Sequence, residues 1–534
     1  MRFPPVSSAA MLAFAACFPF LEPLTAADCE GLAGIQLPDT TISLARAVPA
    51  GTFTPPAGRP IPGVAAFCRV AGTIKPSSDS DIQFEVWMPA AGWNGKFQGV
   101  GNGGYAGAIG FGELAANVTR GYATASTDTG HTAGGTDAGW ALDHPQKIVD
   151  FGYRAIHETA DKAKAIITAF YGSGPKRSYF SSCSNGGRQA LMEAQRFPTD
   201  YDGIIAGAPA NSWTHLFTGF LWDIQALMVD PGAYIPAGKL PAIEAAALAS
   251  CDSLDGLKDG VIDDPRQCRF DPGTLLCKGA ESDACLTAPQ VGALRKLYSG
   301  PVDGKGKSVY FGRSVGGETG GGGWSAWVTG SSPGNSAVFA FGTQFFANMI
   351  FDNGKWDYHT FSVERDMKTA DTKMARTLNA TDPDLKRFQA RGGKLILYHG
   401  WSDAAIPPLN AIDYYQTVVA KMGAKEADQF VRLFMVPGMQ HCGGGPGPNS
   451  FGQSGAAQGS PQTNIASALE QWVEGSVAPN QIVATHYKTG VTPPSVERTR
   501  PLCAFPAVAR WTGKGSSEEA ANFTCVKQDA AKGK

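Results

Sequence analysis

The chain has 534 residues, of which 43% are hydrophobic and 17% are charged, and its formal net charge is −2 at pH 7. This composition is typical of a folded globular protein, and the length allows more than one structural unit. A net charge so close to zero gives no electrostatic basis for binding nucleic acid or an anionic membrane. The 66 glycines and 36 prolines predict many turns and long loops on a frame that contains strands.

The N-terminus has the layout of a secretory signal peptide. Arg2 supplies a positive charge, residues 9–21 form a short apolar segment, and small residues follow at 24–27. A membrane anchor is the alternative, but the apolar segment is short for a spanning helix. We therefore expect residues 1–27 to be removed and the mature protein to be secreted or periplasmic.

Cysteine usage agrees with export. Cys17 lies in the expected signal peptide, and the ten remaining cysteines are an even number, which favours five disulfides in an oxidising compartment. Because no C-x-x-C pair is present, zinc ligation by cysteine is a weaker alternative.

Strands and helices alternate in the first part of the chain, as in an α/β sheet. The signals are period-two alternation for strands and apolar residues at every third or fourth position for helices. The expected elements are strands at 82–88, 96–100 and 122–128, a helix over 146–171, an extended run from Tyr179, a helix over 189–195 and a strand at 203–207.

This alternation stops between residues 212 and 385, a segment rich in glycine and aromatic residues. So long a departure favours an inserted domain over a loop, and its aromatic residues could form its own core or line a cleft for flat substrates. The pattern then resumes, with strands at 394–400 and 430–436, helices at 409–422 and near 465–472, a strand near 482–485 and a frayed tail after Glu518. We expect segments 28–211 and 386–534 to form one domain that carries the insertion.

The stretch Tyr179–Arg188 has the layout of a nucleophile elbow, a tight strand-to-helix turn that exposes a serine hydroxyl. The usual pattern is G-x-S-x-G. Around Ser184, Ser182 replaces the first glycine and Gly186 keeps the second, so both flanking positions are small. An ordinary glycine-rich loop before a helix is the alternative.

Two polar residues later in the chain favour the elbow. Asp403 follows the strand at 394–400 and His441 follows the strand at 430–436. The order Ser184, Asp403, His441 is that of α/β-hydrolases, and all three residues would project from one edge of the sheet. We predict Ser184 as nucleophile, His441 as its base and Asp403 as the group that orients the base, whereas His399 could serve structurally.

The loop Gly101–Gly104 directly follows the strand at 96–100. It lacks the Lys-Ser/Thr of a phosphate-binding loop and the helix of a dinucleotide fingerprint. It fits better as a loop that donates a backbone N–H to an oxyanion hole.

Cys183 directly precedes the predicted nucleophile, and Cys442 directly follows the predicted base. If Ser184 and His441 are within hydrogen-bonding reach, these cysteines are close enough for a disulfide. A Cys183 nucleophile is the competing idea, but it leaves Cys442 unexplained.

Several motifs together resemble the tannase/feruloyl esterase family, which includes bacterial mono(2-hydroxyethyl) terephthalate hydrolase. They are Cys183-Ser184-x-Gly186-Gly187, Asp202-Gly203-Ile204, Gly207-Ala208-Pro209-Ala210, His399-Gly400-x-x-Asp403 and Pro437-Gly438-Met439-x-His441-Cys442. The resemblance covers nearly the whole mature chain. It implies an α/β-hydrolase fold with a large lid at 212–385, the same triad and disulfide, and oxyanion donors at the N–H of Asn185 and of Gly103 or Gly104.

The resemblance also implies a structural calcium site in the lid and no organic cofactor. Its ligands would be the side chains of Asp252, Asp255 and Asp259 and the backbone carbonyls of Leu257 and Val261. Carboxylates at this density suit Ca²⁺, although the loop is not an EF-hand. A solvated acidic turn closed by a Cys251–Cys268 disulfide is the alternative. The remaining disulfides implied by the resemblance are Cys29–Cys68, Cys277–Cys285 and Cys503–Cys525.

The implied function is hydrolysis of a small-molecule ester of an aromatic acid, such as a feruloyl, other hydroxycinnamoyl or galloyl ester. Hydrolysis of a terephthalate monoester is the alternative, and it needs a cation for the free carboxylate, for which Arg313 is a candidate. A secreted calcium-dependent binding protein on a hydrolase frame is the alternative from another class, and an intact triad argues against it.

Overall fold

The computed structural model describes Met1 and residues 28–453 and 455–527. The expected signal peptide, apart from Met1, lies outside the described residues. Within the described ranges, no helix combines the length and apolar character needed to span a membrane.

A nine-stranded sheet forms the centre of the molecule, in the order β1-β4-β5-β7-β6-β8-β9-β10-β11. The strands are β1 Thr40–Val48, β4 Phe67–Ile74, β5 Ile82–Pro89, β6 Lys96–Val100, β7 Ala123–Thr127, β8 Arg177–Cys183, β9 Gly203–Gly207, β10 Lys394–Gly400 and β11 Val431–Val436. From β7 to β11 the neighbours pair in parallel, whereas β1, β4 and β5 pair antiparallel. The carboxyl ends of six strands therefore meet at one edge.

Alternating side chains bury both faces of this sheet. On β10, Leu395 and Leu397 join the core beneath α3, α4 and α13, whereas Ile396 and Tyr398 join the core beneath α15. Such apolar strands are typical of a parallel sheet covered on both sides. The helices outside the insertion are α1 Phe111–Thr119, α2 Pro145–Val149, α3 Ala155–Tyr171, α4 Asn185–Arg196, α12 Lys386–Ala390, α13 Leu409–Met422, α14 Ala424–Asp428 and α15 Ile465–Gly475.

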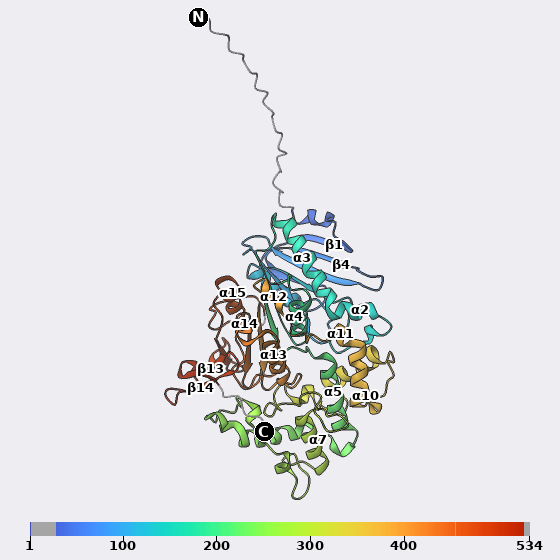
Figure 1. Ribbon diagram of the computed structural model, residues 1–534, viewed down its shortest axis with the longest axis vertical. Coiled ribbons are helices and arrows are strands. Elements are labelled where there is room, and N and C mark those ends of the chain that lie inside the picture. The colour runs from blue at the N-terminus through green and yellow to red at the C-terminus, as the bar shows by residue number, and fades with distance from the viewer. Residues whose placement is uncertain (2–27, 454, 528–534) are drawn as a thin grey trace.

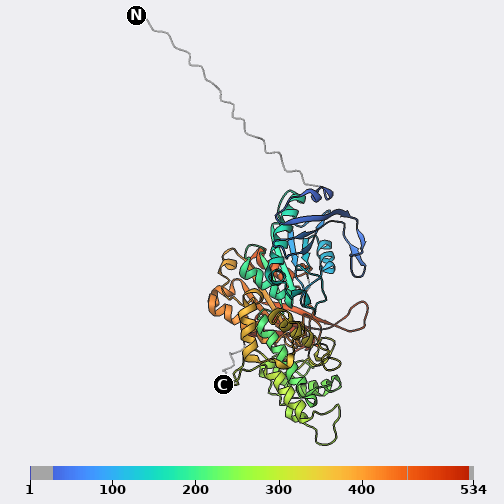
Figure 2. The same cartoon turned by 90° about the vertical axis from the view of Figure 1, so that its right-hand side faces the viewer.

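The segment between β9 and β10 lies at one end of the molecule, beyond the sheet (Figures 1 and 2). It is mainly helical, with α5 Trp213–Met228, α6 Leu240–Cys251, α7 Ala288–Ser299, α8 Trp324–Trp327, α9 Ala337–Phe345, α10 Val363–Ala370 and α11 Arg376–Leu378. Three two-stranded sheets complete the fold, formed by β2 Gly51–Phe53 with β3 Ile61–Val64, β12 Gln481–Tyr487 with β13 Val496–Cys503, and β14 Ala507–Trp511 with β15 Phe523–Lys527.

Several elements differ from the sequence-based expectations, and two of these differences have a clear physical reason. Strand β4 is missing from the predicted elements because buried Arg69 interrupts its apolar pattern, and Arg69 is tolerated there because its Nε donates to Glu85 at 2.8 Å. The tail is not frayed throughout, because β15 pairs with β14 and Cys525 is bonded to Cys503.

Candidate active site

Ser184 lies at a sharp turn between β8 and α4. Its backbone has φ +67° and ψ −126°, a region that non-glycine residues rarely adopt, and its N–H donates to the Gly207 carbonyl at 2.9 Å. Space around the turn is tight. A Cβ on Gly186 would lie 1.9 Å from Ser182 Oγ, and a Cβ on Gly187 would lie 2.3 Å from the Gly207 oxygen. This geometry has the features of the predicted nucleophile elbow.

His441 and Asp403 are brought together in the loops that follow β11 and β10. His441 Nδ1 lies 2.8 Å from Asp403 Oδ2. An imidazole protonated at Nδ1 donates to this carboxylate and leaves Nε2 free to accept a proton. The other oxygen, Asp403 Oδ1, accepts hydrogen bonds from the backbone N–H of Ala405 at 2.7 Å and of Ile406 at 2.9 Å.

Asp403 is fully buried yet stays strongly acidic. Burial by itself raises its pKa, but the charge of His441 and hydrogen bonds from His399 and His441 outweigh burial and hold the pKa below its ordinary value. Ionised Asp403 therefore contributes stability at neutral pH, and this contribution is lost as the pH falls below about 4. His399 Nε2 lies 3.1 Å from Asp403 Oδ2 and 3.0 Å from the Ile406 carbonyl. These contacts agree with the expectation that His399 has a structural role.

Ser184 and His441 line the same pocket, whose wall is otherwise mainly aromatic and aliphatic. The remaining lining residues are Gly104, Asn185, Ala210, Trp213, Leu216, Phe217, Phe220, Trp327, Phe341, Ala405 and Ile406. The Trp327 ring meets the His441 ring edge-on at 5.0 Å and stacks with the Phe341 ring at 6.1 Å. Among the described residues, no lysine, arginine, aspartate or glutamate belongs to this lining.

The predicted oxyanion donors lie close to Ser184. Gly104 and Asn185 line the pocket itself, and Gly103 lines a neighbouring cavity beside Cys183 and Cys442. The Asn185 side chain accepts a hydrogen bond from Arg188 Nε at 2.8 Å, within the same helix. Gly104 has φ +54°, and a Cβ there would lie 2.2 Å from the Gly135 carbonyl oxygen, so this loop needs glycine.

A pair of buried amides, Asn102 and Gln189, ties the glycine loop to α4, and no sequence pattern predicts this contact. Gln189 Oε1 accepts from the backbone N–H of Asn102 at 2.9 Å, and Gln189 Nε2 donates to Asn102 Oδ1 at 3.1 Å. Asn102 Nδ2 also donates to the carbonyls of Ala108 and Thr127. Gln189 therefore helps to hold the glycine loop beside the N-terminal end of α4, where Ser184 lies.

We expect Gln189→Leu to lower kcat about 10- to 100-fold, with a smaller change in KM, because displacing the glycine loop weakens stabilisation of the transition state more than substrate binding. The measurement is steady-state kinetics on an aryl ester. Gln195→Leu is the control, since Gln195 lies on the same helix and bonds to Tyr414 and the Ala380 carbonyl instead. Equal effects of the two substitutions would contradict this role of Gln189.

The Cys183–Cys442 disulfide joins the two loops that carry Ser184 and His441, with a Cα–Cα distance of 5.9 Å. Cys183 is therefore bonded in the structure and is not a free thiol. The other disulfides are Cys29–Cys68, Cys251–Cys268, Cys277–Cys285 and Cys503–Cys525, which are the expected pairs.

Arg313 was a candidate cation for binding a substrate carboxylate, but it does not line the pocket. Its side chain is buried, pairs with Asp223 Oδ2 at 2.7 Å and donates to the carbonyls of Ala404 and Ala405. Its charge is thus neutralised inside the protein, and its hydrogen bonds support the pocket wall at Ala405 from behind.

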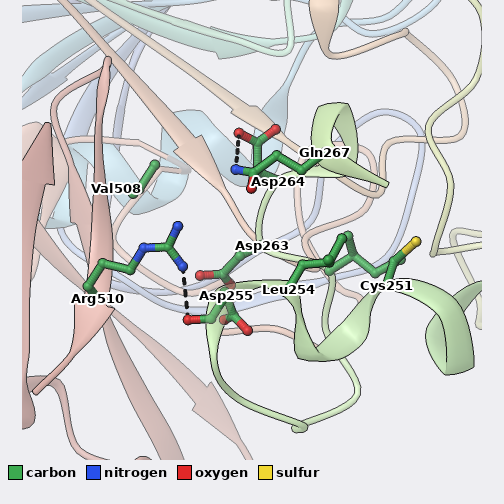
Figure 3. A pocket seen from close by; sticks show the side chains of 9 residues that line it. Cys251, Leu254, Asp255, Asp263, Asp264, Gln267, Val508 and Arg510 are labelled. Carbon is green, nitrogen blue, oxygen red and sulfur yellow. Dashed lines mark hydrogen bonds between the residues drawn. The ribbon is translucent and has the colours of Figure 1, made fainter. Parts of the chain in front are cut away.

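The loop expected to bind calcium packs against the C-terminal strands. Figure 3 shows Asp255 and Asp263 facing Arg510 of β14, and Arg510 Nη1 donates to the Asp255 carbonyl at 2.9 Å. Asp259 Oδ2 pairs with Arg500 of β13 at 2.7 Å. Asp263, which lies beside Asp255, is absent from the predicted ligand set.

The three predicted carboxylate ligands are near one another but do not converge on one point. The Asp252 carboxylate accepts hydrogen bonds from the backbone N–H groups of Asp259 and Gly260 at 3.2 and 3.1 Å. Across the described ranges, Asp252, Asp255 and Asp259 do not form a set whose oxygens all lie within 4.8 Å of one another. Asp259 Oδ1 is nevertheless buried without a hydrogen-bond partner.

The mainly parallel sheet, the strained serine at a strand–helix turn and the histidine–aspartate pair after later strands are the features of an α/β-hydrolase-like protein. A family model for tannase and feruloyl esterase matches residues 68–526, and the chain belongs to this family.

Similar proteins are esterases. The chain is 46% identical to an uncharacterized esterase of Xanthomonas campestris pv. campestris, over 94% of this chain and 91% of the relative. It is 35% identical to mono(2-hydroxyethyl) terephthalate hydrolase of Piscinibacter sakaiensis, over 86% and 84%. The crystal structure of feruloyl esterase B from Aspergillus oryzae superposes with a TM-score of 0.86 at 31% identity, over 93% and 99% of the two chains. The protein is therefore a carboxylic ester hydrolase, and the non-enzymatic alternative is not retained.

Proposed function

We propose that the protein is an exported serine esterase that hydrolyses esters of uncharged aromatic acids, with hydroxycinnamoyl esters as the preferred class. The observation that carries this proposal is the pocket that Ser184 and His441 share, because its wall is aromatic and aliphatic and, within the described part of the chain, contains no lysine, arginine, aspartate or glutamate. Five disulfides support export, since such bonds persist in oxidising compartments.

In the proposed mechanism, His441 Nε2 accepts the proton of Ser184 Oγ as this oxygen attacks the ester carbonyl carbon. Asp403 stabilises the imidazolium that results, and the N–H groups of Asn185 and the Gly103–Gly104 loop stabilise the oxyanion. His441 then returns the proton to the departing alcohol, which leaves an acyl-enzyme. Water attacks the acyl-enzyme with His441 again as base, and the acid and free Ser184 are released.

The insertion is proposed to act as a lid because it forms most of the aromatic wall of the pocket. Trp213 and Phe217 come from α5, Trp327 from α8 and Phe341 from α9. Flat aromatic walls suit a planar acyl group through stacking and burial of apolar area. A free carboxylate would be desolvated there without a cation, which disfavours terephthalate monoesters, and the three hydroxyls of a galloyl group would find few polar partners.

We expect initial rates to rank methyl ferulate above methyl gallate and both above mono(2-hydroxyethyl) terephthalate, with Ser184→Ala as the background control. Leaving a carboxylate unpaired in the pocket should cost at least about 10-fold in kcat/KM. A faster rate on the terephthalate monoester would overturn the proposed acyl class. Turnover that survives in Ser184→Ala would overturn the mechanism.

A structural calcium ion in the insertion is the second part of the proposal. The predicted donors are all oxygens, as Ca²⁺ prefers, and the unpartnered buried Asp259 Oδ1 offers a ligand. Asp252, Asp255 and Asp259 would bind through side chains, and Leu257 and Val261 through carbonyls. The ion would neutralise these carboxylates and stabilise the contact of the insertion with β13 and β14. It takes no part in the chemical steps.

We expect one calcium per chain by elemental analysis, and a fall of several degrees in melting temperature when it is chelated, because an ion that binds only the folded state stabilises it. Asp252→Asn should lose the ion, whereas Asp283→Asn, an exposed aspartate of the same insertion, should keep it. Protein that contains no calcium and melts identically with and without chelator would contradict the site.

A further inference from the structure

A second cluster of ligand-type side chains lies away from the pocket, where α3 packs beside α4. His157 of α3, Glu193 of α4 and Asp200 after α4 each offer one ligand atom, and these three atoms lie within 4.8 Å of one another. His157 Nδ1 is 2.6 Å from Asp200 Oδ2. Within the ranges that the structure describes, this is the only set of three histidine, cysteine or acidic side chains that meets this spacing.

Glu193 is the residue that points to a ligand. Its side chain is completely buried, and neither carboxylate oxygen accepts a hydrogen bond from a donor in the described part of the chain. No lysine or arginine of that part forms an ion pair with it. The nearest candidate, Lys164, instead donates to the Asp200 carbonyl and lies 3.9 Å from Asp200 Oδ1. The buried Glu193 carboxylate instead faces a second carboxylate, that of Asp200. Two buried carboxylates side by side are costly when both are ionised, so a cation bound between them is a physical explanation for the pair.

We infer that His157 Nδ1 and the carboxylates of Glu193 and Asp200 bind a divalent cation of the Zn²⁺ type. One imidazole and two carboxylates are ligands that Zn²⁺ accepts, usually with water in the fourth position. Atoms that share one Zn²⁺ at about 2.0 to 2.2 Å lie no more than about 4.4 Å apart, so the cluster needs only small side-chain adjustments. The cation would replace the proton that joins His157 and Asp200.

The position of the cluster indicates a structural role. Glu193 lies nine residues beyond Ser184 along the helix, which places it roughly 13 Å from the nucleophile. An ion there would tie α3 to the end of α4 and to the segment that leads into β9. The His157 ring is partly exposed and stacks on Phe197 at 3.8 Å, so an ion can enter from that side.

The chain offers a closely matched control for this site. His359 also has Nδ1 beside an aspartate, Asp357, at 2.7 Å, and it also stacks on an aromatic ring, that of Tyr358, at 4.0 Å. It lacks a buried glutamate. The variants to compare are therefore His157→Phe and Glu193→Gln, with His359→Phe as control, and phenylalanine preserves the ring stacking in both histidine positions.

The experiment is calorimetric titration of ZnCl₂ into the full-length mature protein kept in excess CaCl₂, with Co²⁺ absorption spectra and melting curves as further readouts. We expect one equivalent of Zn²⁺ to bind the wild type and His359→Phe and to raise their melting temperature. His157→Phe and Glu193→Gln should bind at least tenfold more weakly and lose the visible Co²⁺ bands. Absence of binding to the wild type, or equal binding by Glu193→Gln, would overturn the inference. A higher melting temperature of Glu193→Gln with no Zn²⁺ binding by the wild type would indicate a proton shared by Glu193 and Asp200 instead.

Discussion

Asp403→Asn is expected to lower kcat by about 10⁴-fold with little change in KM, the size of effect known when an orienting aspartate is lost from a serine triad. The asparagine keeps the shape of the side chain and can still accept the N–H groups of Ala405 and Ile406 through its oxygen. Its amide nitrogen then faces His441 and favours the tautomer protonated at Nε2, which cannot accept the serine proton. Steady-state kinetics on a methyl hydroxycinnamate measures the effect.

Asp413→Asn is the matched control for this substitution, because Asp413 is an exposed aspartate on α13 and lies outside the Asp403–His441 pair. Its kcat should match that of the wild type. An Asp403→Asn protein that keeps a tenth or more of the wild-type kcat would contradict the assignment of Asp403 as the group that orients His441.

Removing the Cys183–Cys442 disulfide with the double substitution to serine is expected to reduce both stability and kcat. The bond closes a loop of 259 residues, for which chain entropy gives about 5 kcal/mol. It also holds the loops of Ser184 and His441 together, and a misplacement of about 1 Å between reacting groups can cost about 100-fold in rate. Melting curves and steady-state kinetics measure the two effects separately.

Cys277→Ser with Cys285→Ser is the comparison, because that disulfide spans only 8 residues within the insertion and touches neither catalytic loop. It should lower stability by about 2 to 3 kcal/mol at most and leave kcat unchanged. If the Cys183–Cys442 variant unfolds at a lower temperature but retains wild-type kcat when folded, the bond stabilises the fold without positioning the catalytic pair.

The six parallel strands β6 to β11 of the central sheet could be predicted because each one leaves a local signal. The segments at 394–400 and 430–436 are mainly apolar, and each is followed by glycine and polar residues, so Asp403 and His441 stand out at their ends. The insertion gave no such signal. Its helices α5 and α9 are apolar on most sides because they pack on each other and on the pocket, and this removes the periodicity that marks an exposed helix.

The roles of residues that depend on contacts between distant parts of the chain could not be predicted from the sequence. In the sequence, Gln189 has the pattern of an ordinary helix residue. Its contact with Asn102, 87 positions earlier in the chain, is visible only in the folded structure. The sequence likewise does not show that Arg313 forms an ion pair with Asp223. Glu193 is likewise unremarkable in a helix, and only its complete burial beside His157 singles it out.

The central claim is that Ser184 forms a covalent acyl-enzyme, and labelling with an aryl phosphonate ester tests it most directly. Such reagents phosphonylate an activated serine and release the aryl alcohol. Intact-mass measurement and peptide mapping should find one adduct per chain, on Ser184, with loss of activity in proportion to labelling. The adduct should be absent from Ser184→Ala and form far more slowly in His441→Ala. Complete inactivation with the adduct on another residue, or full activity after Ser184 is labelled, would contradict the account.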